Sequence, residues 1–221
     1  METKYLILYL VAFLNLLLGL FIIKKNRRSK INLYFGSLCI VGCIWTLSMS
    51  LLYTLNNLAV LDWIIRLMVV TSTLMFLLYF LFALQYPYPT PVRKPWLIPV
   101  LPVILIVLGL LGFLPVEKLY FFNGRLVEQT IFGNYLIFAI YYIVYLFLTF
   151  YVLFKKFFAS EGIQRLQLKY ILISSGVTFA IMTFFSVILP LINGYFTDWF
   201  SPIFTLINFF VISHLIFIKN R

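Results

Sequence analysis

Seven long apolar stretches, separated by short polar segments, constrain the fold of this chain more than any other feature. A helix needs about 20 apolar residues to cross the roughly 30 Å of hydrocarbon in a bilayer. Seven stretches have this character: residues 5–23, 31–55, 63–86, 96–115, 134–154, 170–192 and 202–218. Because backbone polar groups cannot stay unpaired in lipid, we expect these stretches to be helices packed in one bundle. The sequence therefore predicts an all-α membrane protein, a seven-transmembrane-helix bundle forming a single domain over residues 1–221.

The basic residues predict how this bundle is oriented. The run KKNRRSK, residues 24–30, carries five positive charges between the first two apolar stretches. Lys and Arg beside a span are retained on the cytoplasmic side, so we expect this loop inside, the N-terminus outside and the C-terminus cytoplasmic. With that orientation 13 of the 17 basic residues fall in cytoplasmic segments. The expected location is the inner (plasma) membrane of the cell, with multiple crossings.

Charge and histidine content narrow the classes of function. A net charge of +11 is compatible with nucleic-acid binding, but the basic residues form short clusters between apolar stretches. This arrangement favours the lipid bilayer, with its anionic headgroups, as the partner, and no nucleic acid. A metal or haem site needs several His, Cys or carboxylate ligands, whereas the chain has one histidine, His214, and no carboxylate within a predicted span. We expect no catalytic residue, no metal, no cofactors and no enzymatic activity.

A face of small residues runs along the second predicted helix. Five small or hydroxyl side chains recur there at steps of three and four: Gly36, Cys39, Cys43, Thr46 and Ser50. Such a face lets another helix approach closely, or alternatively it forms the wall of a polar pocket. The two cysteines lie in the middle of an apolar stretch, so we expect free thiols instead of a disulfide.

The fifth predicted helix carries an aromatic face with the same period. Its members are Tyr135, Phe138, Tyr142, Tyr145 and Thr149. Tyrosine hydroxyls in hydrocarbon need hydrogen-bond partners, so this face is expected to look into the bundle. It is either part of the core or the wall of an aromatic ligand site. On the second interpretation Tyr142 and Tyr145 are candidate ligand-binding residues.

Charged and amide side chains near or within the spans complete the candidate site. Asp62 and Arg66, one helical turn apart at the outer start of the third predicted helix, form an interfacial salt bridge or orient a ligand in the outer mouth. Asn15 and Asn208 lie at mid-membrane depth, where amides normally bond across to other helices. Thr205 extends the polar face of Asn208. The candidate ligand-binding residues are Asp62, Arg66, Tyr142, Tyr145 and Asn208.

The outer loop between predicted helices four and five has structure of its own. In KLYFFNGRLVEQ, residues 118–129, Asn123-Gly124 separates two β-prone runs. This dipeptide is the strongest short-range signal for a two-residue hairpin turn. We therefore expect a small β-hairpin, which lies either across the outer mouth of the bundle or on the lipid headgroups.

Several motifs, taken together with their order and spacing, resemble a known family. They are FGSLCIVGCIW at 35–45, LFALQYP at 81–87, GIQRLQLKYILISSGVTF at 162–179, ILP at 188–190 and SPIFTLINFFVISHLIFIKNR at 201–221. Over nearly the whole chain they are similar to the N-terminal seven-transmembrane (7TM) sensor region of bacterial histidine kinases. The residues that carry catalysis in that family belong to another domain, so none is carried over to this chain.

The resemblance implies a sensory or receptor module of a two-component signal-transduction system. In such a module the outer loops and bundle interior detect a stimulus, and helix seven passes the change to a cytoplasmic kinase or other output domain. That output domain is expected beyond Arg221 and is absent from this chain. The resemblance also implies a possible homodimer. Two alternatives stay open: a small-solute transporter, and a stand-alone membrane partner protein.

Overall fold

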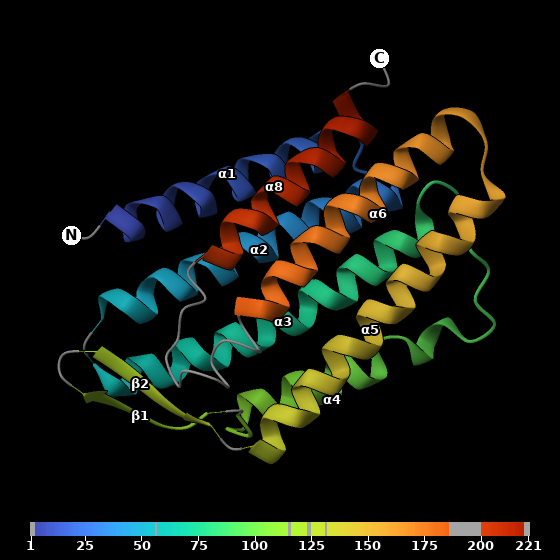
Figure 1. Ribbon diagram of the computed structural model, residues 1–221. Coiled ribbons are helices and arrows are strands. Elements are labelled where there is room, and N and C mark those ends of the chain that lie inside the picture. Colours follow the sequence, from blue (N-terminus) through green and yellow to red (C-terminus); the bar gives the residue numbers. More distant parts are fainter. Residues whose placement is uncertain are drawn as a thin grey trace.

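The computed structural model describes residues 3–55, 57–114, 116–122, 125–130, 132–185 and 200–218. Seven α-helices lie within these ranges (Figure 1): α1 (Thr3–Lys25), α2 (Lys30–Thr54), α3 (Leu58–Gln85), α4 (Val100–Leu110), α5 (Phe132–Ala159), α6 (Gly162–Thr183) and α8 (Ser201–Ser213). A 3-10 turn, η1 (Pro95–Leu97), precedes α4, and a π-helical turn, η4 (His214–Ile218), continues α8.

Five of the described helices are long and apolar enough to cross a membrane, namely α1, α2, α3, α5 and α6. Two shorter apolar helical stretches accompany them, Pro95–Leu110 and Ser201–Phe217. The prediction of a helical, multi-pass membrane protein that contacts the lipid bilayer is therefore confirmed.

Helix α2 is the most buried of the five long helices. It packs against α1 and α3 and also contacts α8. Of the 18-residue apolar segment of α2, 67% is buried. The corresponding share is 28% for α5, which lies at the edge of the bundle. All five residues of its predicted small face are buried, and both cysteines are free thiols, so these two predictions are confirmed.

Glycines allow α1 and α2 to cross at close range. A Cβ added to Gly19 would lie 2.7 Å from the carbonyl oxygen of Gly36, and one added to Gly36 would lie 2.9 Å from that of Gly19. Both distances are shorter than real Cβ contacts, so only glycine fits at this crossing. The turn between the helices is fixed by Ser29, which caps α2, and by Asn32, whose side-chain amide donates to the Ile22 carbonyl at 2.9 Å.

The fourth predicted span, residues 96–115, is wrong in its extent. The α-helix covers only Val100–Leu110, 11 residues, or about 16 Å at 1.5 Å per residue. Pro99 sits at its N-cap and Pro102 lies in its first turn, and a proline lacks the N–H that a longer helix would need. At the other end Gly112 has φ +94°, a left-handed conformation that stops the helix.

Three long helices also differ from their predicted bounds. Helix α5 continues to Ala159, beyond the predicted end at residue 154, so Lys155 and Lys156 lie in the helix instead of a loop. Helix α6 begins at Gly162, eight residues before the predicted start at Tyr170. Helix α3 begins at Leu58, where Asn57 caps it by accepting from the backbone of the first turn. The spans were predicted from the apolar stretches alone. Basic and polar residues such as Lys, Arg and Gln are also compatible with a helix, so these helices extend beyond the apolar stretches.

The chain between α4 and α5 forms two antiparallel strands, β1 (Val116–Phe122) and β2 (Arg125–Thr130). Phe122 pairs with Arg125 at the end where the strands join. Residues 123–124, at which the turn of the hairpin is predicted, lie outside the described residues. Figure 1 shows the strands beside the end of α3 at which that helix begins.

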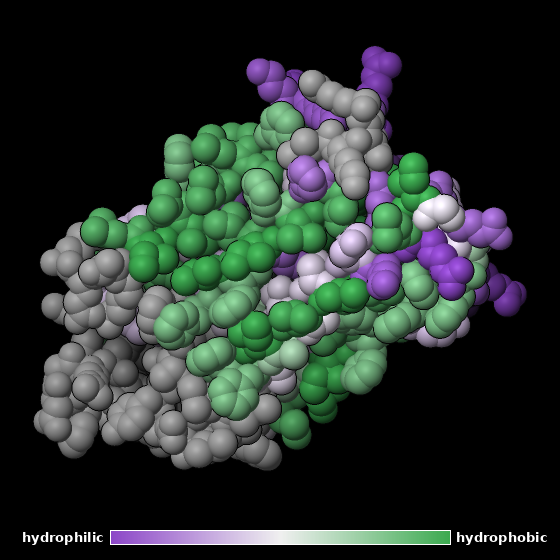
Figure 2. All heavy atoms as spheres, turned by 45° about the horizontal axis from the view of Figure 1, so that its top comes forward, coloured by the Kyte–Doolittle hydropathy of each residue, from purple (hydrophilic) through white to green (hydrophobic). Residues whose placement is uncertain are grey.

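Polar contacts gather at the opposite end of the bundle. There the ends of α1, α3, α5 and α8 meet the beginnings of α2 and α6 (Figure 1), and the basic run 24–30 connects α1 to α2. Figure 2 shows hydrophobic side chains over the flank of the molecule and hydrophilic ones collected toward this end. The described basic turns therefore share one end, which we call the basic end.

Candidate functional site

A small cavity of about 50 Å³ lies between four helices. Its lining is mostly aromatic, leucine and methionine, with a few hydroxyl and amide groups. The lining residues are Leu38 and Trp45 of α2, Ser72, Met75, Phe76 and Tyr79 of α3, Thr178, Phe179 and Met182 of α6, and Thr205, Asn208 and Phe209 of α8. A space of this size holds several water molecules or one small organic molecule.

A hydrogen-bond network connects three of these helices at the cavity. Asn208 of α8 is 3% exposed, and its carboxamide oxygen accepts from the hydroxyls of Ser174 at 2.9 Å and Ser175 at 3.3 Å, both on α6. The Ser175 hydroxyl is also hydrogen-bonded to the phenol of Tyr79 on α3. The prediction that Asn208 faces other helices and bonds across to them is confirmed.

Tyr142 of the predicted aromatic face lies next to the cavity lining. Its hydroxyl is 2.8 Å from that of Ser72, and its ring stacks on Phe76 with centroids 4.9 Å apart. Ser72 and Phe76 both line the cavity, so Tyr142 supports this wall from α5. The structure thus brings together two of the five candidate residues, Tyr142 and Asn208.

Tyr145 and its neighbour Tyr141 belong to a separate part of the core. The Tyr145 hydroxyl donates to the carbonyl of Ile98, just before α4. Tyr141, which the predicted face omitted, is 2% exposed and donates to the Thr73 carbonyl at 2.8 Å. Phe138 and Thr149 are buried as predicted. The α5 face therefore does look into the bundle, and it is one residue wider than its period of three and four indicated.

Asp62 and Arg66 lie away from the cavity, against the end of α4. The Arg66 Nε is 2.9 Å from the Asp62 carboxylate, and its Nη1 donates to the Leu110 carbonyl at 2.6 Å. The guanidinium also lies over the Trp63 ring and beside Gly112. The salt bridge is therefore present, and the same arginine holds the last turn of α4 through one of its otherwise unpaired carbonyls.

Asn15 behaves differently from the prediction that it bonds across helices. It is 0% exposed, and neither atom of its amide has a hydrogen-bond partner within the described part of the chain. A Cβ added to Gly42 would lie 3.9 Å from the amide nitrogen of Asn15 and 3.0 Å from the ring of Phe209, which lines the cavity. Asn15 therefore packs near the cavity wall without forming the interhelical bond expected of it.

A second polar cluster at the basic end was not predicted. Lys156 of α5 is 3% exposed, and its ammonium donates to four carbonyls at 2.6–2.9 Å, those of Ala83, Leu84, Tyr86 and Tyr88. Four charge-assisted bonds compensate for the removal of the ammonium from water. They also satisfy carbonyls at the end of α3 that a helix leaves unpaired. The sequence offered no signal for this contact, because backbone carbonyls occur at every residue.

The end of α3 is connected in turn to the end of α8. The Tyr86 phenol donates to the side-chain oxygen of Gln167 on α6 at 2.7 Å, and the Gln167 amide donates to the Leu215 carbonyl in η4 at 2.8 Å. The Lys25 ammonium of α1 donates to the Phe217 carbonyl of the same turn. Residues of α1 and α6 thus contact the final turn directly, and Tyr86 at the end of α3 is joined to it through Gln167.

Comparisons with protein-family models and with curated proteins find no match for this chain. The resemblance to 7TM sensor regions of histidine kinases therefore stays a prediction.

Proposed function

We propose that this chain is the membrane-embedded sensory module of a histidine-kinase-type signal-transduction system. It lies in the inner membrane with its N-terminus outside and its C-terminus cytoplasmic. Occupancy of the cavity changes the position of α8, and η4 passes this change to a cytoplasmic output domain. The homodimer and the kinase or other output domain implied by the family resemblance are part of the same proposal.

One observation carries the proposal: a single residue of α8, Asn208, both borders the cavity and holds α8 to α6. Its oxygen accepts from two α6 hydroxyls, so a molecule in the cavity competes with or reinforces the contact that positions this helix. A ligand shifts an equilibrium only through different affinities for two states. Loosening and tightening of the α6–α8 contact are two such states.

The other end of the same helix supports the proposal. Gln167 and Lys25 contact the carbonyls of η4, and Gln167 is bonded to Tyr86 at the end of α3. Helix α3 also lines the cavity through Ser72 and neighbouring residues. Of the helices around the cavity, α6 therefore also contacts the turn that would lead to an output domain, and the end of α3 is joined to this contact through Tyr86.

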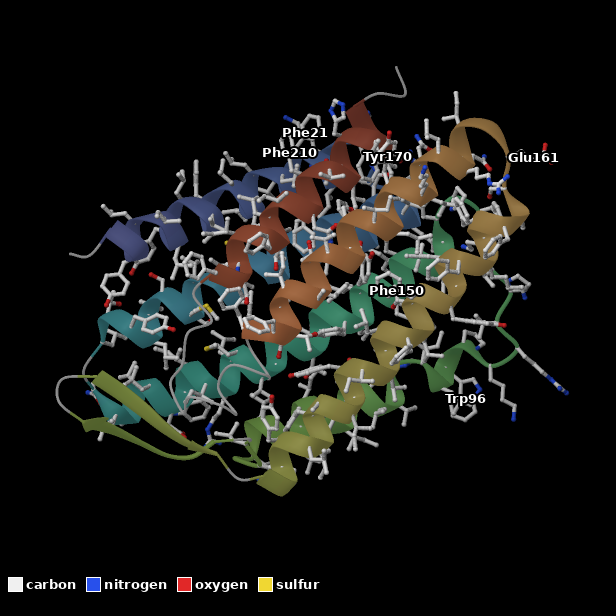
Figure 3. All side chains as sticks on the ribbon, viewed as in Figure 1. Phe21, Trp96, Phe150, Glu161, Tyr170 and Phe210 are labelled. Carbon is white, nitrogen blue, oxygen red and sulfur yellow. The ribbon has the colours of Figure 1, made fainter. Side chains whose placement is uncertain are left out.

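The test fills the cavity from a helix other than α8 and measures whether α8 moves. Leu38→Phe on α2 enlarges a lining side chain, and Leu33→Phe makes the same change on the exposed face of α2, at 44% exposure. Spin labels at cysteines replacing Phe210 and Glu161 report the distance between α8 and the α5–α6 turn (Figure 3). The native cysteines are buried and therefore react slowly with the label.

In nanodiscs we expect Leu38→Phe to shift the mean label distance by on the order of 1–2 Å, and Leu33→Phe to leave it unchanged. Equal distances in both variants, with the cavity shown to be filled, would contradict the sensor proposal. Uptake of small solutes by proteoliposomes would instead favour a transporter.

A further inference from the structure

The side chains around the cavity use their polar atoms to hold the helices together. Each hydroxyl of the lining has a partner: Ser72 with Tyr142, Tyr79 with Ser175, Thr178 with the Phe204 carbonyl and Thr205 with the Ser201 carbonyl. The oxygen of Asn208 accepts from two serine hydroxyls. Almost all of the surface that the lining presents to the cavity is apolar.

Buried polar atoms without a hydrogen-bond partner in the described part of the chain lie outside the cavity lining. They include both amide atoms of Asn15 and the hydroxyls of Ser50, Ser160 and Ser213. Among the described residues, none of these atoms belongs to a residue that lines the cavity. A water molecule inside a protein needs two to four polar partners, and apolar cavities stay dry. The cavity therefore suits an apolar occupant better than water.

We infer that this cavity binds a small, uncharged, apolar molecule through contacts with aromatic, leucine and methionine side chains. Methionines such as Met75 and Met182 are flexible and polarizable, so they adapt to the shape of an occupant. An apolar cavity of about 150 Å³ binds benzene or xenon, so a space of about 50 Å³ limits the ligand to about two to four non-hydrogen atoms. This inference rests on the proposed function, because it names the chemical class of the stimulus at the same site.

Trp45 lines the cavity and provides a local signal for binding. A bromine atom in contact with an indole ring quenches its fluorescence. Trp45 is 6% exposed, so bromine compounds dissolved in the lipid have little access to it from outside, whereas Trp63 is 64% exposed and meets them directly. Two forms of the full chain are made for nanodiscs, each keeping one tryptophan, Trp45 or Trp63, with the other tryptophans replaced by phenylalanine.

The probes are 1-bromopropane and 2-bromoethanol, which have the same number of non-hydrogen atoms and differ by a methyl group in place of a hydroxyl. For Trp45 we expect quenching by 1-bromopropane to saturate with its aqueous concentration. Half-saturation by 2-bromoethanol should need at least about a tenfold higher concentration, because burying its hydroxyl in apolar surroundings is unfavourable. Quenching of Trp63 should rise with both probes without saturating.

Substitutions of Leu38, a lining residue that is 2% exposed, test whether the probe binds in the cavity. In the Trp45 form, Leu38→Phe should remove the saturable quenching, and Leu33→Phe on the exposed face of α2 should leave it unchanged. Leu38→Ala enlarges the space and should allow saturable quenching by 1-bromohexane, which the wild-type cavity is too small to hold. Saturable quenching that neither Leu38 variant alters would place the probe elsewhere and overturn the inference.

The remaining outcomes separate this inference from the proposed function. Half-saturation by both probes at the same concentration would overturn the apolar class and leave the cavity as the site of the sensor. Quenching of Trp45 that does not saturate with 1-bromopropane would overturn the inference, while the label distances in Leu38→Phe, which need no ligand, decide the sensor proposal. Saturable binding that leaves the distance between labels at residues 210 and 161 unchanged would support the ligand class and contradict the sensor proposal.

Discussion

The contact between α1 and α2 and the contact between α6 and α8 are built in opposite ways. At the first, Gly19 and Gly36 bring two backbones together so closely that no side chain fits between them. At the second, the helices are joined by hydrogen bonds from Ser174 and Ser175 to Asn208 beside a cavity. A glycine crossing has one geometry, whereas hydrogen bonds next to an open space can be exchanged for others. The comparison indicates that α1 and α2 form a fixed frame and that α8 is the adjustable element.

The largest effect is expected from Gly19→Ala, which places a methyl group in the close contact between α1 and α2. The added Cβ would lie 2.7 Å from the Gly36 carbonyl oxygen, so the two helices must separate. We expect a loss of about 1–3 kcal/mol in the free energy of unfolding, as for other overpacked sites. Gly176→Ala on α6 is the control, because nothing lies within 4 Å of its added Cβ. Equal melting temperatures for the two variants would show that the crossing is not tight.

A smaller loss is expected from Asn208→Leu at the adjustable contact. It removes the acceptor of two serine hydroxyls. A hydrogen bond between membrane helices contributes about 0.6 kcal/mol on average, so we expect a loss of roughly 1 kcal/mol. Steric-trap unfolding in bicelles measures the change, with the lipid-facing Phe210→Leu as control. A loss equal to that of Gly19→Ala would remove the distinction between the two contacts.

Asn15→Leu, on α1 of the fixed frame, is expected to raise the free energy of unfolding instead of lowering it. Because the amide of Asn15 is buried and has no partner among the described residues, an apolar side chain of similar size should stabilise the chain by about 1 kcal/mol. The same unfolding assay checks the sign. A destabilised variant would mean that Asn15 has a bound partner such as an ordered water.

The smallest effect is expected from Ser174→Ala, which sharpens the account of the α6–α8 contact. Asn208 keeps its bond from Ser175, so the loss should be about 0.5 kcal/mol. In the double variant with Asn208→Leu the two losses should not add, because both changes remove the same bond. Full additivity would show that Ser174 and Asn208 act independently.

Hydrophobic periodicity predicted the parts of this fold that depend on which face of a helix is buried. The small face of α2, the aromatic face of α5 and the inward position of Asn208 all follow from spacing and polarity. Periodicity carries no information on which atoms meet. It therefore missed the four carbonyls around Lys156 and the lack of a partner for the Asn15 amide among the described residues. Length of an apolar stretch likewise failed at α4, where prolines and Gly112 limit the helix.

The shortness of α4 also affects the surrounding lipid. Its 11 residues span about 16 Å, roughly half the usual hydrocarbon thickness, while side chains such as Val103, Ile104 and Val107 on its surface are about half exposed. A bilayer meeting this flank must thin, or its headgroups must descend toward η1 and Gly112. Such hydrophobic mismatch costs fractions of a kcal/mol per ångström. Acyl-chain length therefore becomes a physical variable that acts on the chain from the α4 side.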